Sequence, residues 1–206
     1  MKKLLALLLL LGAMAGCNRQ SDQELPIWGE RSTQGTDTVY HSIRNFAFYN
    51  QDSARISDQT VAGKVYVADF FFTSCPSICI EMAKQMLRVW ERFGQHPDFM
   101  ILSHSLDPEF DTQPVLKQYA RGLGVPDGGS WHFLTGGETD VYELGQQQYF
   151  VTAKQDQKAP GGVLHSGAFV LVDQQGRIRG VYDGTDPARV DQLMLDIQKL
   201  LPPAGQ

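Results

Sequence analysis

The chain is short of cysteine and has no surplus of basic residues. Only three of its 206 residues are cysteines, and its formal net charge is −5. An acidic balance gives no support for nucleic-acid binding, which usually shows as a basic surface. The sequence also has no run of five like charges and no internal repeat. Thiol chemistry therefore has few places where it can occur, and charge patterning indicates no further partner.

The first cysteine follows an N-terminal export signal. The segment MKKLLALLLLLGAMAGC has two lysines, an apolar stretch and then small residues, which is the layout of such a signal. The apolar stretch is shorter than the ~20 residues of a transmembrane helix. Small residues before Cys17 resemble a bacterial lipoprotein cleavage site, and an ordinary secretory signal is the alternative. We predict a signal peptide over residues 1–17 that ends at a lipidated Cys17.

The predicted anchor places the protein in the bacterial cell envelope. It would be tied to a membrane on the extracytoplasmic (periplasmic) side, where disulfides persist. Residues 18–44 are polar, lack a convincing period and are predicted to be a tether. Residues 45–203 are predicted to form one domain, since 42% of the chain is hydrophobic and can build a core.

Apolar runs and helical patterns alternate along this domain. Strands are predicted at 63–74, 98–108 and 130–136, with two more around a turn within 167–184. Helices are predicted after the first strand, with Pro76 in the first turn, and at 113–122, 138–147 and 187–200. This alternation predicts an α/β fold with helices on both faces of a sheet. The segment 148–166 is long for a loop inside a domain, and we expect it to be functional or mobile.

The two remaining cysteines, Cys75 and Cys79, are four residues apart at the first strand-to-helix corner. On a helix their Cβ atoms would lie about 5–6 Å apart, which is looser than the 3.5–4.5 Å typical of a disulfide. A bridge there would be strained and labile. A helix N-terminus also favours a thiolate. A structural bridge, a redox pair and two soft ligands for Cu(I) or zinc all remain open.

A metal site would need at least one more donor, and the sequence has five histidines. His165 ends the long loop directly before a buried strand, a position from which ligands often come. His104 lies near the end of the second strand, and His132 lies within the third strand, where we expect it to be packed. His41 and His96 are expected to be solvated.

Three separated motifs, FFFTSCPSIC, LDPEFDT and LHSGAFVLVD, resemble the Sco (SenC) family of copper proteins across roughly residues 45–200. The resemblance implies a thioredoxin-like fold, with a central mixed sheet flanked by helices and an inserted loop and hairpin. It also implies copper binding, as Cu(I), Cu(II) or both, and a role in maturing the binuclear copper centre of cytochrome c oxidase.

Carried over residue by residue, the resemblance makes Cys75, Cys79 and His165 the copper ligands. The aspartate of its "DP" motif falls on Asp107, which is expected in the outer shell of the site. The alternative for Asp107 is a turn residue before Pro108. The family often has proline after the second cysteine, whereas this chain has Ile80. His104 matches no position that the resemblance assigns.

The resemblance implies a metallochaperone that delivers copper to the copper-site subunit of cytochrome c oxidase. Other copper chaperones or thioredoxin-like reductants are further expected partners, and no nucleic acid is expected. The alternative is a thiol–disulfide oxidoreductase in which Cys75 and Cys79 are the catalytic redox pair that reduces the oxidase's copper-ligand cysteines. A peroxidase is disfavoured because its Thr/Pro/Arg setting is missing. Whether the protein is an enzyme stays open.

Overall fold

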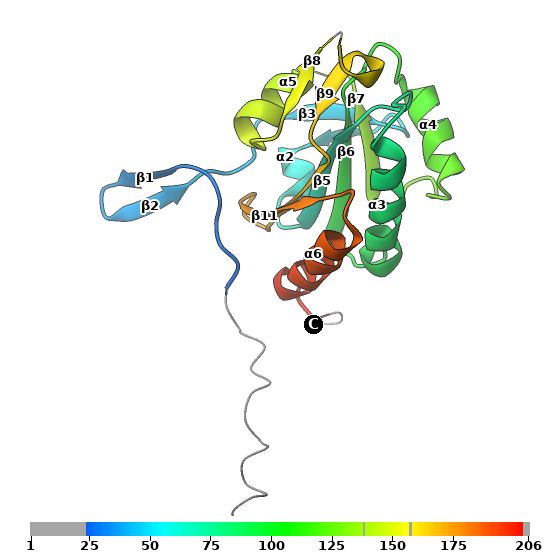
Figure 1. Ribbon diagram of the computed structural model, residues 1–206. Helices are drawn as coiled ribbons and strands as arrows, with labels where there is room; N and C mark the ends of the chain where they lie inside the picture. The colour runs from blue at the N-terminus through cyan, green and yellow to red at the C-terminus, as the bar shows by residue number, and fades with distance from the viewer. Residues whose placement is uncertain (1–23, 138, 157, 204–206) are drawn as a thin grey trace, which may run out of the picture.

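The computed structural model describes residues 24–203 except 138 and 157 (Figure 1). The predicted signal peptide and Cys17 lie outside the described residues. The core is a seven-stranded sheet with strand order β11-β10-β5-β6-β7-β3-β4. In that order the strands are Ile178–Asp183, Ala168–Val172, Val65–Phe71, Phe99–Ser105, Trp131–Thr135, Ala47–Asn50 and Arg55–Ser57.

The three central strands β5, β6 and β7 are parallel, while β10 and β3 pair with them antiparallel. Parallel neighbours need a crossover connection. Helix α3 (Cys79–Phe93) connects β5 to β6, and α4 (Gln113–Gly122) lies between β6 and β7. The carboxyl ends of β5, β6 and β7 therefore meet at one edge of the sheet. The mixed sheet agrees with the expected fold.

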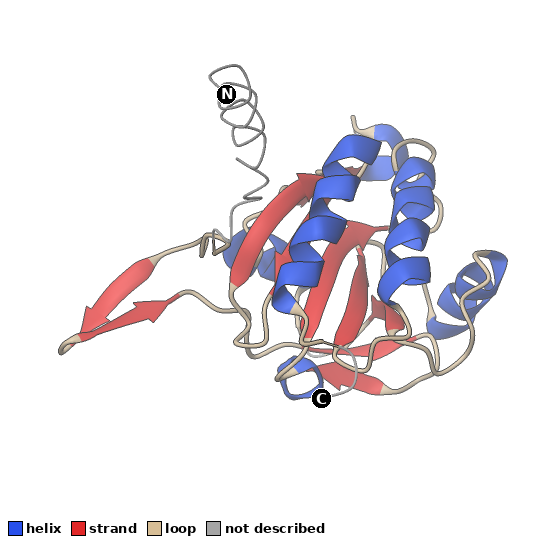
Figure 2. Ribbon diagram, turned by 90° about the horizontal axis from the view of Figure 1, so that it is seen from below, coloured by secondary structure: helices blue, strands red, loops and turns tan. Residues whose placement is uncertain are grey.

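The two faces of the sheet bury two separate hydrophobic clusters, because side chains alternate along a strand. Val65 and Val67 of β5 lie in the cluster beneath α3, α4 and the last helix, α6 (Pro187–Leu200). Tyr66 and Ala68 lie in the other cluster. Figure 2 shows helices laid across one face of the sheet. The opposite face is covered by α2 (Asp58–Val61), α5 (Val141–Glu143) and the π-helical turn η2 (Leu144–Gln148).

Helix α3 starts later than expected. Its first residue is Cys79, so Cys75 and Pro76 lie in the turn that precedes the helix and not in its first turn. The backbone N–H of Cys75 donates to the Phe72 carbonyl at 3.2 Å, which folds this turn back on the end of β5. The helical i,i+4 geometry assumed for the cysteine pair was therefore wrong.

Two segments that were predicted to have no regular structure contain short hairpins. Within the expected tether, β1 (Arg31–Gln34) pairs with β2 (Asp37–Tyr40) in an arm that projects from the body (Figure 1). Within the expected long loop, β8 (Ala153–Gln155) pairs with β9 (Val163–His165) around a 3₁₀ turn, η3 (Pro160–Gly162). The helix expected at 138–147 is present as α5 followed directly by η2, which together cover residues 141–148.

The segment before the arm is held against the outer edge of the sheet. The Trp28 N–H donates to the Ile178 carbonyl at 2.9 Å. The guanidinium of Arg179 donates to the carbonyls of Leu25 and Pro26 and pairs with Asp173 at 2.9 Å. Among the residues that the structure describes, no helix has the length and apolar character to cross a membrane.

Candidate metal centre

Cys75, Cys79 and His165 meet at the carboxyl end of β5. One donor atom from each, two sulfurs and one imidazole nitrogen, lie within 4.8 Å of one another. Both cysteines are unbridged, and their exposed fractions are only 8% and 4%. The turn between β5 and α3 supplies the sulfurs, and the end of the β8–β9 hairpin supplies the imidazole. The structure thus brings together the three residues that were predicted to be metal ligands.

The position of His165 is fixed by backbone pairing and by an aromatic neighbour. His165 lies opposite Ala153 in the β8–β9 ladder, and the ring of Phe72 packs edge-on against its imidazole at 5.8 Å between centroids. Imidazole Nδ1 lies 3.3 Å from the Ser166 carbonyl oxygen, to which it can donate. The Nε2 lone pair is then free, and Nε2 lies 3.5 Å from Cys79 Sγ. Such a second bond fixes the tautomer in which Nε2 is the ligand.

The glycine-rich turn of the hairpin packs onto the same phenylalanine. Gly161 has φ +77°, and a Cβ on it would lie 2.7 Å from the Phe72 ring. The next residue, Gly162, has φ +79° with open space around its Cβ position. Only glycine adopts such backbone angles without strain. The close approach at Gly161 seats the hairpin on Phe72 and therefore sets where His165 lies.

The two thiols differ in acidity. Burial raises the pKa of Cys75, but hydrogen bonds from Cys79 and Ser77 outweigh burial and leave this pKa below the ordinary 9.0. Burial and the neighbouring Cys75 raise the pKa of Cys79 well above 9.0. The first charge of the pair therefore resides on Cys75, with the Cys79 thiol donating to it. Burial also lowers the pKa of His165 below 6.5, so its imidazole is neutral at pH 7 and able to bind a metal.

The spacing of the three donors suits a single soft metal ion. Sulfur and nitrogen donors bind such ions at about 2.0–2.3 Å, which puts donors of one ion about 3.5–4 Å apart. The Sγ–Nε2 distance of 3.5 Å meets this range, and all three atoms fall within 4.8 Å. Two thiolates and an imidazole are the donors that Cu(I), Cu(II) or zinc accept. The same unbridged sulfurs could also close a disulfide.

Asp107 lies in the turn that follows β6. Its N–H donates to Ser105 Oγ at 3.1 Å, and its carboxylate accepts from the Phe110 N–H at 3.4 Å. These contacts lie within the turn, and they fit the alternative given for Asp107, a turn residue before Pro108. Its expected place in the outer shell of the metal site stays a prediction.

The sequence analysis missed Asp111, four residues further on. This fully buried carboxylate accepts hydrogen bonds from the Thr73 N–H at 3.0 Å and from the Ser105 hydroxyl at 2.6 Å, and also from the Thr73 hydroxyl. It thereby fixes the residue two positions before Cys75. The position of Asp111 inside the LDPEFDT motif was the available signal.

His104 lies on the other face of the sheet, away from the donors. It has no exposed surface, and its ring is stacked on Phe70 at 5.0 Å and set edge-on to Phe48 at 5.3 Å. Neither ring nitrogen has a hydrogen-bond partner of normal geometry among the described residues. His104 is packed as an aromatic ring and takes no part in the metal centre. His132, in β7, accepts at Nδ1 a hydrogen bond of 3.1 Å from the side-chain amide N–H of Asn50.

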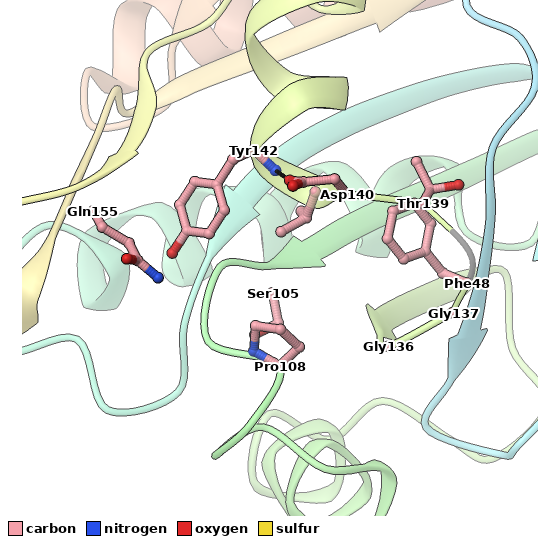
Figure 3. A pocket seen from close by; sticks show the side chains of 10 residues that line it. Phe48, Ser105, Pro108, Gly136, Gly137, Thr139, Asp140, Tyr142 and Gln155 are labelled. Atoms are coloured by element: carbon pink, nitrogen blue, oxygen red, sulfur yellow. Dashed lines mark hydrogen bonds between the residues drawn. The ribbon is translucent and has the colours of Figure 1, made fainter.

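A larger cavity, of about 360 Å³, lies at the ends of β6 and β7 and contains none of the three donors (Figure 3). Ser105 and Pro108 lie on one side of it and Tyr142 and Gln155 on the other. The Asp140 carboxylate beside it is engaged with the N–H groups of Tyr142 and Glu143. The cavity therefore offers no second set of metal donors.

Comparison with known proteins agrees with this geometry. The family model described as SCO1/SenC matches residues 34–201. A relative from Bacillus subtilis, called SCO1 protein homolog, is 29% identical over 164 residues, which cover 79% of this chain and 84% of the relative. A protein of Stutzerimonas stutzeri that is named for copper binding is 29% identical over 168 residues, 78% of this chain and 76% of that protein.

A solved structure extends the comparison to the fold. BsSco, described as a member of the Sco family of cytochrome c oxidase assembly proteins with a disulfide switch, superposes with a TM-score of 0.69. It is 27% identical, and the match covers 86% of this chain and 98% of that one. The fold is thioredoxin-like, as the family resemblance implied, and the recognition of the family is confirmed.

Proposed function

The chain belongs to the SCO1/SenC family, and on that premise we propose that it binds one copper ion between Cys75, Cys79 and His165 and passes it to an acceptor protein. The observation that carries the proposal is the meeting of two sulfurs and one imidazole nitrogen within 4.8 Å. The donors come from elements almost ninety residues apart in sequence, and a structural pair of thiols would not need the imidazole.

Copper fits this donor set in either oxidation state. Thiolate sulfur favours Cu(I), and the imidazole extends the site towards Cu(II). The relative named for copper binding supports the choice of metal. Both thiols must be deprotonated in the complex, so loading releases protons and weakens as the pH falls. The thiol that gives up its proton with more difficulty is Cys79, because burial raises its pKa.

Delivery of the ion follows from where the ligands are attached. His165 is the last residue of a short hairpin, whereas the cysteines are fixed by the end of β5 and the start of α3. Withdrawal of the hairpin would remove one of three donors and leave the ion on two sulfurs, open to the thiols of an acceptor. The description of BsSco supports cytochrome c oxidase as the destination, and the copper-site subunit is the acceptor that we propose.

An anaerobic titration tests the proposal. The fully reduced protein is titrated with Cu(I) while free thiols are counted in the same samples. One ion per chain should protect both thiols from alkylation, and Cys75→Ser or Cys79→Ser should abolish tight binding. Binding that leaves both thiols free to react, or that persists in these two variants, contradicts the site.

A second function has its own support in the asymmetry of the thiols. A thiol–disulfide oxidoreductase needs one acidic thiol that attacks first and a second thiol that keeps its proton until it resolves the mixed disulfide as a thiolate, and the pKa directions of Cys75 and Cys79 suit these two tasks. His165→Ala separates the two functions. Copper affinity should fall in the variant, while reduction of a disulfide in the oxidase subunit should persist if reduction is the main task.

The membrane anchor is part of the proposal. We place residues 1–17 as the signal peptide and Cys17 as the lipidated residue, with the domain held at the extracytoplasmic side of the bacterial envelope. Mass spectrometry of the mature protein should find a lipid on Cys17, and Cys17→Ser should release the protein from membranes. A mature chain that begins at another residue and carries no lipid would show an ordinary secretory signal instead.

A further inference from the structure

Arginine and aromatic side chains gather where the β1–β2 arm joins the body of the protein (Figure 1). The guanidinium carbons of Arg31 and Arg177 lie 5.5 and 5.1 Å from the centre of one ring, that of Tyr40. Trp28 lies beside them, because its N–H donates to the carbonyl of Ile178, and its exposed fraction is 51%. We call Trp28, Arg31, Tyr40 and Arg177 the arm-base patch, and no role described so far uses it.

The two arginines of the arm-base patch have no acidic partner. Among the described residues neither forms an ion pair, not even Arg31 with the neighbouring Glu30, whereas Arg179 pairs with Asp173 at 2.9 Å. Guanidinium groups keep their charge at every physiological pH. Two positive charges over one ring repel each other, so an external anion between them is favoured. The positive charge is local, since the chain as a whole has a net charge of −5.

One face of the arm continues the patch away from the body. Arg31 pairs with Tyr40 and Thr33 pairs with Thr38 across the two strands, so these four side chains share one face. That face carries no carboxylate. Asp37 pairs with the last residue of β1 and belongs to the opposite face. The arm therefore presents a positive and hydroxyl-bearing face next to the patch.

A cavity of about 240 Å³ opens beside the patch. It reaches the patch at Gly176, the residue before Arg177. Its lining includes Ser42, Arg44, Asp58, Gln174 and Gln175. Arg44 donates to the Ser42 hydroxyl oxygen at 2.6 Å and, among the described residues, forms no ion pair. The Asp58 carboxylate already accepts hydrogen bonds from two backbone N–H groups. The cavity thus offers guanidinium, hydroxyl and amide donors, which suit a phosphate group.

The patch and the metal centre lie at opposite ends of the sheet. Val172 pairs with Tyr66 near the start of β5, and the turn that leads to Arg177 follows Val172. Cys75, in contrast, follows the end of β5. A strand of seven residues, such as β5, separates its two ends by about 20 Å. A surface that binds the patch therefore leaves the metal centre accessible to a second partner.

We propose that the arm-base patch, with the cavity beside it, rests on the headgroups of an anionic lipid membrane. Tryptophan and tyrosine favour the interface between lipid and water, and arginine is attracted to anionic headgroups. The inference rests on the proposed anchor for its proximity. Cys17 is seven residues before Glu24, the first described residue, and a chain of that length spans at most about 25 Å.

The anchor also decides between the possible occupants of the patch. An acidic protein would offer similar charges, but a lipid on Cys17 would hold the membrane within reach at all times. Contact at the patch fixes the orientation of the domain on the bilayer, with the metal centre turned away from the lipid. An acceptor would then have to present its copper-binding thiols above the membrane surface and not within it.

Sedimentation with vesicles tests the patch without the anchor. The mature chain carrying Cys17→Ser is mixed with excess lipid, since binding through the patch alone is weak and reversible. It should bind vesicles of phosphatidylglycerol and phosphatidylethanolamine and should not bind vesicles of phosphatidylcholine. Arg31→Gln and Arg177→Gln should each lower the partition coefficient about fivefold. Absence of binding to the anionic vesicles, or equal binding to both kinds, overturns the proposal.

Arg189→Gln is the matched control for these variants. Its guanidinium carbon also lies over a tyrosine ring, that of Tyr182 at 5.9 Å, but it is in the first turn of α6, away from the patch. The change in net charge is the same, and the partition coefficient should stay within twofold of the wild type. Arg31→Lys keeps the charge and should stay within threefold. A loss in Arg189→Gln equal to that in Arg31→Gln contradicts a local patch.

Trp28 gives a second measurement, made on the lipidated chain in anionic vesicles that contain brominated lipid. Bromine quenches the emission of a tryptophan that touches the bilayer. Trp28 is exposed, whereas Trp131 has an exposed fraction of 2%. The wild type should be quenched and Trp28→Phe should lose this quenching, while equal quenching in both, or none in the wild type, contradicts the contact. A chain without the lipid would sink the anchor alone, because the sedimentation result with Cys17→Ser does not depend on it.

Discussion

Buried carboxylates on one face of the central sheet and a buried histidine on the other have different surroundings. On the face beneath α3 and α4, Asp69 and Asp111 accept hydrogen bonds from serine, threonine and backbone groups. On the other face, His104 is buried among aromatic rings with no partner of normal geometry among the described residues. Hydrogen-bonded carboxylates therefore lie next to the metal centre, whereas His104 packs as a ring among aromatic side chains on the other face.

The same comparison explains why two histidines near strand termini have different roles. His104 follows the alternation of β6 and points into the aromatic cluster. His165 ends β9, a two-stranded ribbon outside the main sheet, which carries it to the sulfurs. Residue type alone does not separate them. The strand that carries each side chain, and the face to which it points, decide the role.

The largest loss of stability should come from removing a buried carboxylate that accepts several hydrogen bonds. Asp111→Ala leaves the Thr73 N–H, the Thr73 hydroxyl and the Ser105 hydroxyl without their acceptor, and each buried donor left unpaired costs about 1–3 kcal/mol. The free energy of unfolding, measured in urea at pH 7, should fall by about 3–5 kcal/mol. Copper binding should weaken as well, because the turn that holds Cys75 loses its anchor.

Asp107→Ala is the control for that variant in the same loop. Asp107 accepts one long hydrogen bond, from the Phe110 N–H at 3.4 Å, so its loss should cost less than about 1 kcal/mol. Equal losses in the two variants would show that the network around Asp111 contributes nothing specific.

The next largest effect is on the pH dependence of the free energy of unfolding, to which buried groups on the two faces of the sheet contribute in opposite directions. Burial lowers the pKa of His104 from 6.5 to about 4, so the unfolded chain binds its proton more readily than the folded chain does. The contribution of His104 to stability is complete above pH 6.5 and is lost as the pH falls to 4, by about 3 kcal/mol in total. Asp69 acts in the opposite direction. Burial raises its pKa from 3.8 to about 7, so its contribution is complete below pH 3.8 and is lost as the pH rises to 7.

His104→Phe removes the titratable imidazole and keeps an aromatic ring in the cluster. Relative to the wild type, the variant should gain about 3 kcal/mol of unfolding free energy between pH 6.5 and pH 4. Urea unfolding of both proteins at several pH values measures the difference, and contributions common to both cancel. Parallel pH curves would mean that His104 is hydrogen-bonded or accessible to solvent in solution.

The smallest effect concerns the glycine turn of the hairpin. Gly162→Ala should cost about 1 kcal/mol, because alanine resists the positive φ and meets no neighbour. Gly161→Ala adds a contact of 2.7 Å with Phe72, so it should cost more and should also lower copper affinity by displacing His165. The two variants are compared by urea unfolding and by copper titration. Equal effects in both assays would mean that the hairpin does not depend on the Phe72 contact.

Much of the fold could be predicted because its strands are buried on both faces and its helices are periodic. The run over β5 is buried throughout and is apolar apart from Asp69, and α4 and α6 start and end at the expected residues. The short hairpins were missed because strands of three or four residues, largely exposed, have no hydrophobic pattern. The start of α3 was misplaced because Pro76 suits a helix start and a turn equally.

The three ligands of the metal centre could be predicted from the sequence, but the buried side chains around them could not. The cysteine spacing and the histidine before a buried strand are visible in the sequence, and the family resemblance joined them. Asp69, inside the apolar run of β5, and Asp111, in the LDPEFDT motif, were missed because their hydrogen-bond partners lie far from them in sequence. Ser103 donates to Asp69 and Thr73 donates to Asp111, and the fold alone brings these residues into contact.

One measurement tests the central claim, that two sulfurs and the His165 imidazole bind one copper ion, most directly. The Cu(I) and Cu(II) affinities and the Cu(II) absorption spectrum of the reduced protein are compared for the wild type, His165→Ala and His104→Phe. We expect a loss of Cu(II) affinity of about 100-fold or more and an altered spectrum in His165→Ala, with wild-type values in His104→Phe. Unchanged affinity and spectrum in His165→Ala would contradict the claim, because the sulfurs would then bind copper without the imidazole.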